Sequence, residues 1–308
     1  MQFDQTSIAV RERGMLEIMD LSLHVIRHHF RPLLIMWLVG VVPMMLLNHF
    51  MIGGLLDRVD FDGSYYFGEL GTEVRYFNYI MTILVIVEAP LATLFMSQYL
   101  GNAVFQYRPS LRSQIFSVLK LWWPIVVSQL LIRGVGFFWF LAIFVTTSSD
   151  LDGLSFFVTM LLLYHFALRA ARPYINEIIL LERNPMSSRN PNEVTISKRS
   201  ARLHSAGGSG SGLVFGRTTL AAILGTLLTY AVYGALMFFN GVMWNDWEHG
   251  AILTNIGYPL ALWTVIGFLG VVRFLCYLDT RIRFEGWEVE LRFRAEAERM
   301  RGKVSASR

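Results

Sequence analysis

Two charged residues lie inside stretches that are apolar enough to cross a membrane. Glu88 lies midway along residues 77–100, and Arg133 lies midway along residues 121–146. A charge in the bilayer interior costs roughly 2.5–3.5 kcal/mol on insertion scales. The two stretches are consecutive and antiparallel, and counting about 1.5 Å per helical residue from opposite ends puts both charges near the midplane. We therefore predict that Glu88 and Arg133 form an intramembrane polar pair.

The sequence leaves three roles for these two residues. An ion pair, made directly or through water or Gln129, fixes the packing of the two helices. Alternatively, the pair lines a polar pathway across the membrane. In the third reading the two charges are buried separately and Glu88 is protonated. His165 and Gln98 are weaker candidates for the same polar patch.

A second group of basic residues lies near the ends of apolar stretches. Arg273 comes five residues before the end of the stretch 255–278. Its long side chain either reaches the aqueous face or binds Asp279, Glu177 or a lipid phosphate. Five arginines are candidates for contact with lipid headgroups or for anchoring the helices: Arg108, Arg112, Arg273, Arg281 and Arg283.

Motifs for catalysis or metal binding are missing from the sequence. There is no GxSxG, no HExxH and no carboxylate pair with a supporting base. Cys276 is the single cysteine, which excludes an intramolecular disulfide framework and a cysteine metal cluster. His24 and His28 have i,i+4 spacing, but no acidic ligand accompanies them. We expect a non-enzymatic protein without catalytic residues, cofactor or metal.

The composition favours helices that cross a membrane. The chain is 54% hydrophobic and 16% charged, whereas a soluble domain carries about 25% charged residues. Roughly 20 apolar residues span a bilayer as a helix, and helices satisfy their backbone groups in lipid. We predict an all-α polytopic membrane protein with six spans at about 32–54, 77–100, 121–146, 154–174, 218–241 and 255–278.

The distribution of basic residues predicts the orientation of these spans. All but four of the 27 Lys and Arg residues fall in 1–31, 101–120, 169–217 or 279–308. The other three connections are short and acidic. Basic segments stay in the cytoplasm, so both termini are expected there, in a multi-pass protein of the cell inner membrane. Basic connections at this position predict contact with anionic headgroups rather than with nucleic acid.

The cytoplasmic segments have their own predicted structure. Residues 14–31 form an amphipathic interfacial helix, whose apolar stripe is Leu16, Met19, Leu23, Ile26 and Phe30. The loop 175–217 contains a short helix at about 193–205 and a flexible Gly/Ser linker at 207–212. The tail 279–308 forms a helix from about Trp287. The domains are therefore 1–31, the membrane domain 32–278, and this tail.

Three segments carry a resemblance to a known family. They are "MLEIMDLSLHVIRHHFRPLLIMWLVGVVPMMLL", "RPYINEIILLERNPM" followed by "SKRSARLH", and "YLDTRIRFEGWEVELRFRAEA". The last contains an Asp-x-Arg-x-Arg-x-Glu-Gly motif at Asp279–Gly286. They resemble the bacterial membrane domain found in some glycerophosphodiester phosphodiesterases and in related stand-alone multispan proteins of unknown function. The resemblance implies six helices and cytoplasmic termini. It does not imply phosphodiesterase activity, because the catalytic domain of those enzymes is separate.

Two functions from different classes follow from these features. The first is a scaffold or accessory subunit that docks partners, or a second copy of itself, at the cytoplasmic face. Its long basic inner segments and short outer loops favour this reading. The alternative is a transporter or lipid-handling protein with a polar intramembrane site around Glu88 and Arg133. A closed bundle with that pair sealed together favours the scaffold, and an open lateral groove favours the alternative.

Overall fold

The protein is described by a computed structural model that covers residues 13–58, 72–104, 109–147, 152–188, 190, 193–205, 210–247 and 250–285. This part of the chain is all-α and contains no strand. Its first half holds α1 (Met15–His28), α2 (Phe30–Ile52), the 3₁₀ turn η1 (Gly53–Arg58), α3 (Thr72–Ala92), α4 (Leu94–Val104), α5 (Leu111–Leu119) and α6 (Trp122–Ile125). The π-helical η2 (Val126–Ile132) follows, then α7 (Val135–Thr147), α8 (Asp152–Ala171), α9 (Ile175–Glu177), η3 (Ile178–Glu182), α10 (Ile196–Ser205), α11 (Gly210–Trp244), η4 (Leu253–Gly257) and α12 (Tyr258–Glu285).

Four helical segments are long and apolar enough to cross a membrane. They are Phe30–Asp57, Val74–Val104, Gly212–Trp244 and Leu253–Arg283, and they coincide with the first, second, fifth and sixth predicted spans. A bent pair, α5 with α6 and η2, makes a fifth if it is one span. The predicted third span is broken at Arg133 and Gly134. The predicted fourth span corresponds to α8, whose apolar part is short.

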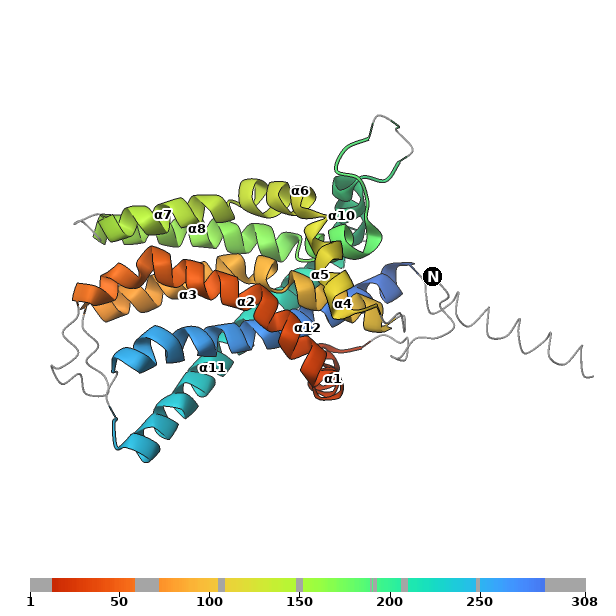
Figure 1. Cartoon of the computed structure of the whole chain (residues 1–308). Coiled ribbons are helices and arrows are strands. Elements are labelled where there is room, and N and C mark those ends of the chain that lie inside the picture. The colour runs from red at the N-terminus through yellow and green to blue at the C-terminus, as the bar shows by residue number, and fades with distance from the viewer. Residues whose placement is uncertain are drawn as a thin grey trace, which may run out of the picture.

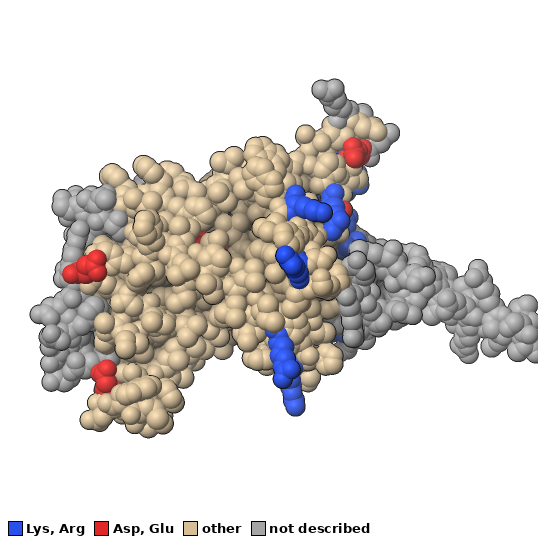
Figure 2. Space-filling view, in the orientation of Figure 1, with Lys and Arg blue, Asp and Glu red and all other residues tan. Residues whose placement is uncertain are grey.

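The long helices form a bundle with two distinct ends, from which α11 diverges at one side (Figure 1). The end of α2 and the starts of α3, α8 and α12 lie together at one end. The other end carries α1, α5 and α10. Figure 2 shows the basic side chains of this face gathered toward the second end, whereas acidic side chains lie at the first end and also beside the basic ones at the second. We call these the basic end and the acidic end.

The segment α3–α4 forms the centre of the bundle, and α11 lies at its edge. Over an apolar stretch of 18 residues in each segment, 83% of the residues are buried in α3–α4 and 11% in α11. The centre is tight because α2 crosses α3 at Gly40, where an added Cβ atom would lie 1.9 Å from the carbonyl oxygen of Ala92. Glycine is required at this crossing, whereas one face of α11 is left open toward its surroundings.

Two breaks in the helices follow from the sequence. Pro90 has no N–H, so the carbonyl oxygen of Ile86 loses its helical donor. The α3–α4 boundary follows at Thr93, whose hydroxyl donates to the Ala89 carbonyl at 2.7 Å. Gly134 separates η2 from α7 with a φ of 72°, a conformation that glycine adopts without a Cβ penalty. Both breaks place polar backbone atoms inside the bundle.

On α1, Leu16 and Leu23 of the predicted stripe are exposed while Ile18 and Ser22 are buried, and the exposed Phe30 is the first residue of α2. The basic end differs from expectation in two places. At the Gly/Ser run, α11 already begins at Gly210, so the end of the predicted linker is helical. The last helix continues to Glu285, so Arg281 and Arg283 belong to it rather than following it. The helix predicted from Trp287 lies outside the described residues.

Candidate functional site

A cavity of about 340 Å³ lies among α3, α8, α11 and α12. Its walls are mostly apolar along its length, with Val85, Leu262, Ile266 and Leu269 on α3 and α12. Toward the acidic end it is lined by hydroxyl-bearing side chains, among them Thr82, Thr229, Tyr230, Tyr233 and Tyr258. Toward the basic end it is lined by three arginines, Arg169, Arg217 and Arg273. The cavity is therefore amphipathic, with its cationic groups at one end.

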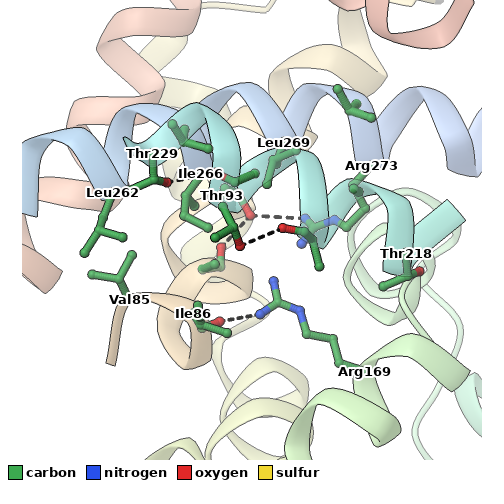
Figure 3. Close-up of a pocket in the computed structure, with 18 of the residues that line it drawn as sticks. Val85, Ile86, Thr93, Arg169, Thr218, Thr229, Leu262, Ile266, Leu269 and Arg273 are labelled. Atoms are coloured by element: carbon green, nitrogen blue, oxygen red, sulfur yellow. Dashed lines mark hydrogen bonds between the residues drawn. The ribbon is translucent and has the colours of Figure 1, made fainter. Parts of the chain in front are cut away.

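Arg169 is held at this end by the proline break in α3. Its Nη1 donates to the carbonyl oxygen of Ile86, the acceptor that Pro90 leaves without a helical donor. Figure 3 shows Arg169 and Arg273 directed toward the same end of the cavity from opposite sides. Arg169 makes no ion pair with a carboxylate among the described residues. The proline thus supplies the acceptor that positions a cationic side chain at the cavity.

Arg273 is fixed by a buried acid and two hydroxyls. Its Nε donates to Glu177 Oε1 at 3.0 Å, and its Nη2 donates to Thr93 and Ser97 at 3.1 and 3.4 Å. Glu177 was one of the three partners that the sequence offered for Arg273. The Glu177 carboxylate is fully buried at the end of α9. Arg273 is therefore a buried residue of the bundle and does not reach out to the aqueous face.

The predicted pairing of Glu88 with Arg133 is not what the structure shows. The Glu88 carboxylate accepts from Asn48 Nδ2 at 2.8 Å and from Trp139 Nε1 at 2.6 Å. Arg133 instead donates to the backbone oxygen of Arg172. Gln129, the proposed mediator, donates to Asn176. The pair fails because the break at Gly134 turns Arg133 toward the basic end, away from α3.

The predicted anchor residues take part in contacts within the chain. Asp279 Oδ2 accepts from Arg217 and Arg283, both at 2.8 Å, and its Oδ1 accepts from the backbone N–H of Arg13 at 2.7 Å. These contacts join the segment before α1 to α11 and α12. Arg112 lies over Phe116 at 5.9 Å on α5, and Arg108 lies outside the described residues. Arg283 thus holds helices together as well as carrying charge.

A second carboxylate at the basic end joins η3, α10 and α12. Glu182 Oε1 accepts from Tyr277 at 2.8 Å and from Arg199 at 3.0 Å, and Arg281 lies 3.7 Å away. Burial acts to raise the pKa of the Glu182 carboxyl, but the donors Arg199 and Tyr277 and the charge of Arg281 hold it below its ordinary value. Arg281 is therefore engaged with an acid of the same chain.

His204 on α10 is a buried neutral base. Its Nδ1 donates to the Ser200 carbonyl at 2.7 Å, its Nε2 faces the Tyr174 backbone N–H at 3.5 Å, and its ring stacks on Tyr174. Burial lowers the pKa of His204 to about 4.

Metal-ligating side chains do not gather anywhere in the described part of the chain. Within those ranges no three His, Cys, Asp or Glu side chains lie close enough together to hold a metal ion.

Sequence reasoning missed one residue that lines the cavity and one that fixes a lining residue. Arg169 was counted only within the span 154–174 and the basic segment 169–217, and Glu177 was considered only as one of several partners for Arg273. The sequence did contain a signal for Arg169. Because Pro90 lies four residues after Ile86, the Ile86 carbonyl oxygen has no helical donor and is a free acceptor inside the predicted span 77–100. His165, a weaker candidate, does line the cavity, and its Nδ1 faces the Arg133 carbonyl at 3.0 Å. Gln98 is buried on α4.

Comparison with known proteins does not assign this arrangement to a family. No protein-family profile, curated protein sequence or solved structure matches the chain significantly. The resemblance to the membrane domain of glycerophosphodiester phosphodiesterases therefore stays a prediction. The function has to be argued from the cavity itself.

Proposed function

We propose that this chain is an integral membrane protein that binds an amphiphile from the surrounding bilayer in the cavity among α3, α8, α11 and α12. One observation carries the proposal: a cavity of about 340 Å³ with apolar walls and arginines at one end lies between apolar helices. Small-molecule pockets have volumes of about 300–1,000 Å³. The space accommodates one chain of a lipid rather than a whole two-chain lipid.

The peripheral position of α11 supports entry from the bilayer. This helix forms one wall of the cavity and is the least buried of the four long helices. Its residues along the middle of the cavity are small, including Ala221, Ala222 and Gly225, with Arg217 before them and Tyr230 and Tyr233 after them. A wall with so few buried residues separates from its neighbour at low cost in buried area.

The proposal includes the membrane topology. We infer that α7 and α8 also span the bilayer, because they lie alongside the long helices (Figure 1), which gives six spans. The basic end then faces the cytoplasm by the charge rule, with both termini on that side of the inner membrane. The exposed Leu16 and Leu23 on α1 and Phe30 at the start of α2 follow one another at intervals of seven residues, as suits a helix resting on the lipid interface.

The scaffold prediction has less support. Its expected docking surface was the cytoplasmic tail, and the two described arginines of that tail, Arg281 and Arg283, bind acids of the same chain. Contact with anionic headgroups at the basic end, a protein partner and self-association remain predictions. A non-catalytic role remains one as well.

Photo-crosslinking with a lipid that carries a diazirine in its acyl chain tests the proposal. We expect peptides of α8 and α12 that line the cavity to be labelled in membranes containing the full chain. Ala222→Phe fills the cavity and should reduce this labelling to background. Ala231→Phe is the matched control, because Ala231 is exposed on the same helix and does not line the cavity. Equal labelling of both variants rules out the cavity as the binding site.

A further inference from the structure

The basic end of the cavity carries more buried positive charge than its acids balance. Arg133 is 7% exposed and Glu177 is fully buried, and the Arg273 side chain is 14% exposed. Glu177 pairs with Arg273 at 3.0 Å, whereas Arg133 and Arg169 donate to the backbone carbonyls of Arg172 and Ile86. Among the described residues of this region, one carboxylate therefore accompanies three guanidinium groups. Buried charge without a counterion is strongly unfavourable, so this region favours an anion.

The donors needed to bind that anion are in place. A guanidinium has five N–H donors, and Arg169 uses Nη1 for the Ile86 carbonyl. Arg273 uses its Nε and Nη2 groups for Glu177, Thr93 and Ser97, which leaves its Nη1 without an acceptor among the described residues. Both side chains are held by these contacts and face the same space (Figure 3). Guanidinium groups held in this way bind phosphate oxygens with little loss of side-chain freedom.

A further donor lies nearer the surface of the basic end. Arg217 lines the cavity one helix away, and its side chain is 7% exposed. Its Nη2 is bound to Asp279, but its Nη1 is buried without an acceptor in the described ranges. The cavity thus has a cationic end built from α8, α11 and α12.

We propose that Arg169 and Arg273 form a binding site for a phosphate group, and that the apolar part of the cavity takes the chain attached to it. This inference rests on the proposed amphiphile binding and names its headgroup chemistry. Arg273 lies six residues before Asp279 on α12, about 9 Å along the helix, so the phosphate binds deeper in the bundle than the ion pairs that Asp279 makes with Arg217 and Arg283. From Arg273 to Tyr258 the same helix provides about 22 Å of cavity wall for the chain.

The experiment compares two single-chain lipids that differ only in the phosphate. The full chain in neutral detergent is mixed with a single-chain lipid bearing a phosphate monoester, or with the monoacylglycerol of the same chain, and bound lipid is measured by native mass spectrometry. We expect the protein to bind the phosphate lipid at least about tenfold more tightly, since a hydrogen bond to a charged group contributes about 1.5–3 kcal/mol. Arg169→Gln should bring the two affinities to within about twofold.

Arg172→Gln is the matched control. It removes the same charge three residues away, where the side chain is exposed and outside the cavity, and it should keep the preference. Inorganic phosphate distinguishes the two sources of the anion. If it displaces the lipid and protects the protein from heat by itself, the site takes free phosphate; if neither occurs, it takes a lipid headgroup.

Two results would overturn the inference in different ways. If the wild-type protein binds both lipids equally and Ala222→Phe removes both, the cavity binds amphiphiles but the anion site is wrong. If neither lipid binds, the proposed function fails together with the site. The wild-type comparison needs no variant, so it decides the question even if Arg169→Gln does not fold.

Discussion

Arg169 and Ile86 are joined by a hydrogen bond that exists because of a proline four residues further along α3. The Ile86 carbonyl would accept from the backbone of residue 90 in a regular helix, and Pro90 offers no N–H. The guanidinium takes this acceptor and is thereby fixed at the cationic end of the cavity. The Ile86 oxygen that Pro90 leaves free is thus the atom that positions Arg169 at the cavity.

Replacing this proline should separate stability from binding. Pro90→Ala restores an N–H that competes with Arg169 for the Ile86 carbonyl, so we expect the melting temperature to stay the same or rise while the preference for the phosphate lipid falls. Pro43→Ala on α2 is the control. Pro43 leaves the Val39 carbonyl without a helical donor, and no side chain binds that carbonyl in the described structure. Loss of preference in both variants would contradict the role of the Ile86 carbonyl.

The buried Glu88 should tolerate an amide but not an apolar residue. Glu88→Leu leaves the donors of Asn48 and Trp139 without an acceptor, at a cost of about 1–3 kcal/mol each. Glu88→Gln should cost under about 1 kcal/mol, because Asn48 can rotate and offer its Oδ1, which has no partner. Thermal unfolding in detergent measures both. If the two variants are equally unstable, the negative charge itself is required, and a cation must lie near it.

The crossing of α2 with the centre of the bundle should depend on one glycine. Gly40→Ala places a Cβ atom 1.9 Å from the Ala92 carbonyl oxygen, so the backbones must separate, and we expect a loss of about 3 kcal/mol or no folded protein. Gly216→Ala on α11 meets nothing within 4 Å and should be neutral or stabilise by up to about 1 kcal/mol. Similar melting temperatures for the two variants would show that α2 and α3 do not cross this closely.

Acid should weaken the basic end through His204. Burial lowers the pKa of His204 in the folded chain to about 4, below the unfolded value of about 6.5. The unfolded chain therefore binds a proton that the folded chain does not, and stability falls as the pH drops from about 6.5 to 4, by up to about 3 kcal/mol from this group. Above pH 6.5 this loss of stability is absent, because His204 is neutral in both the folded and the unfolded chain.

The histidine variants give the measurement. Melting temperatures across this pH range should fall less steeply for His204→Gln than for the wild type. His28→Gln, which changes an exposed histidine on α1, should keep the wild-type slope. A wild-type slope that survives in His204→Gln would assign the acid sensitivity to other groups.

The sequence predicted the helices well where hydrophobicity alone decides them. Four of the six predicted apolar stretches appear as the four long helices, because a run of about 20 apolar residues has few other stable forms in lipid. The longest stretch, 121–146, does not. The break at Gly134 was not predicted, although a glycine can adopt the positive φ that interrupts the helix there. The error over Glu88 and Arg133 follows from that break, since counting residues along a helix assumes that the helix is continuous.

The cavity could not be predicted from the sequence. It depends on how far α11 stands from α12, its neighbour in sequence, and from α3, which is more than a hundred residues away, and side-chain packing sets both separations. Its cationic end could have been predicted, because Pro90 leaves a free carbonyl acceptor and Arg169 lies at the end of an apolar run. What the sequence could not tell is that these two features face each other across the bundle.

An experimental density map of the full chain in a lipid bilayer tests the central claim most directly. The bilayer should contain a lipid with a phosphate monoester headgroup. The account predicts elongated density in the cavity, with its head between Arg169 and Arg273 and its chain running along α12 toward Tyr258. A cavity closed by α11 against α12 and α3, or density whose head lies at the tyrosine end, would contradict it.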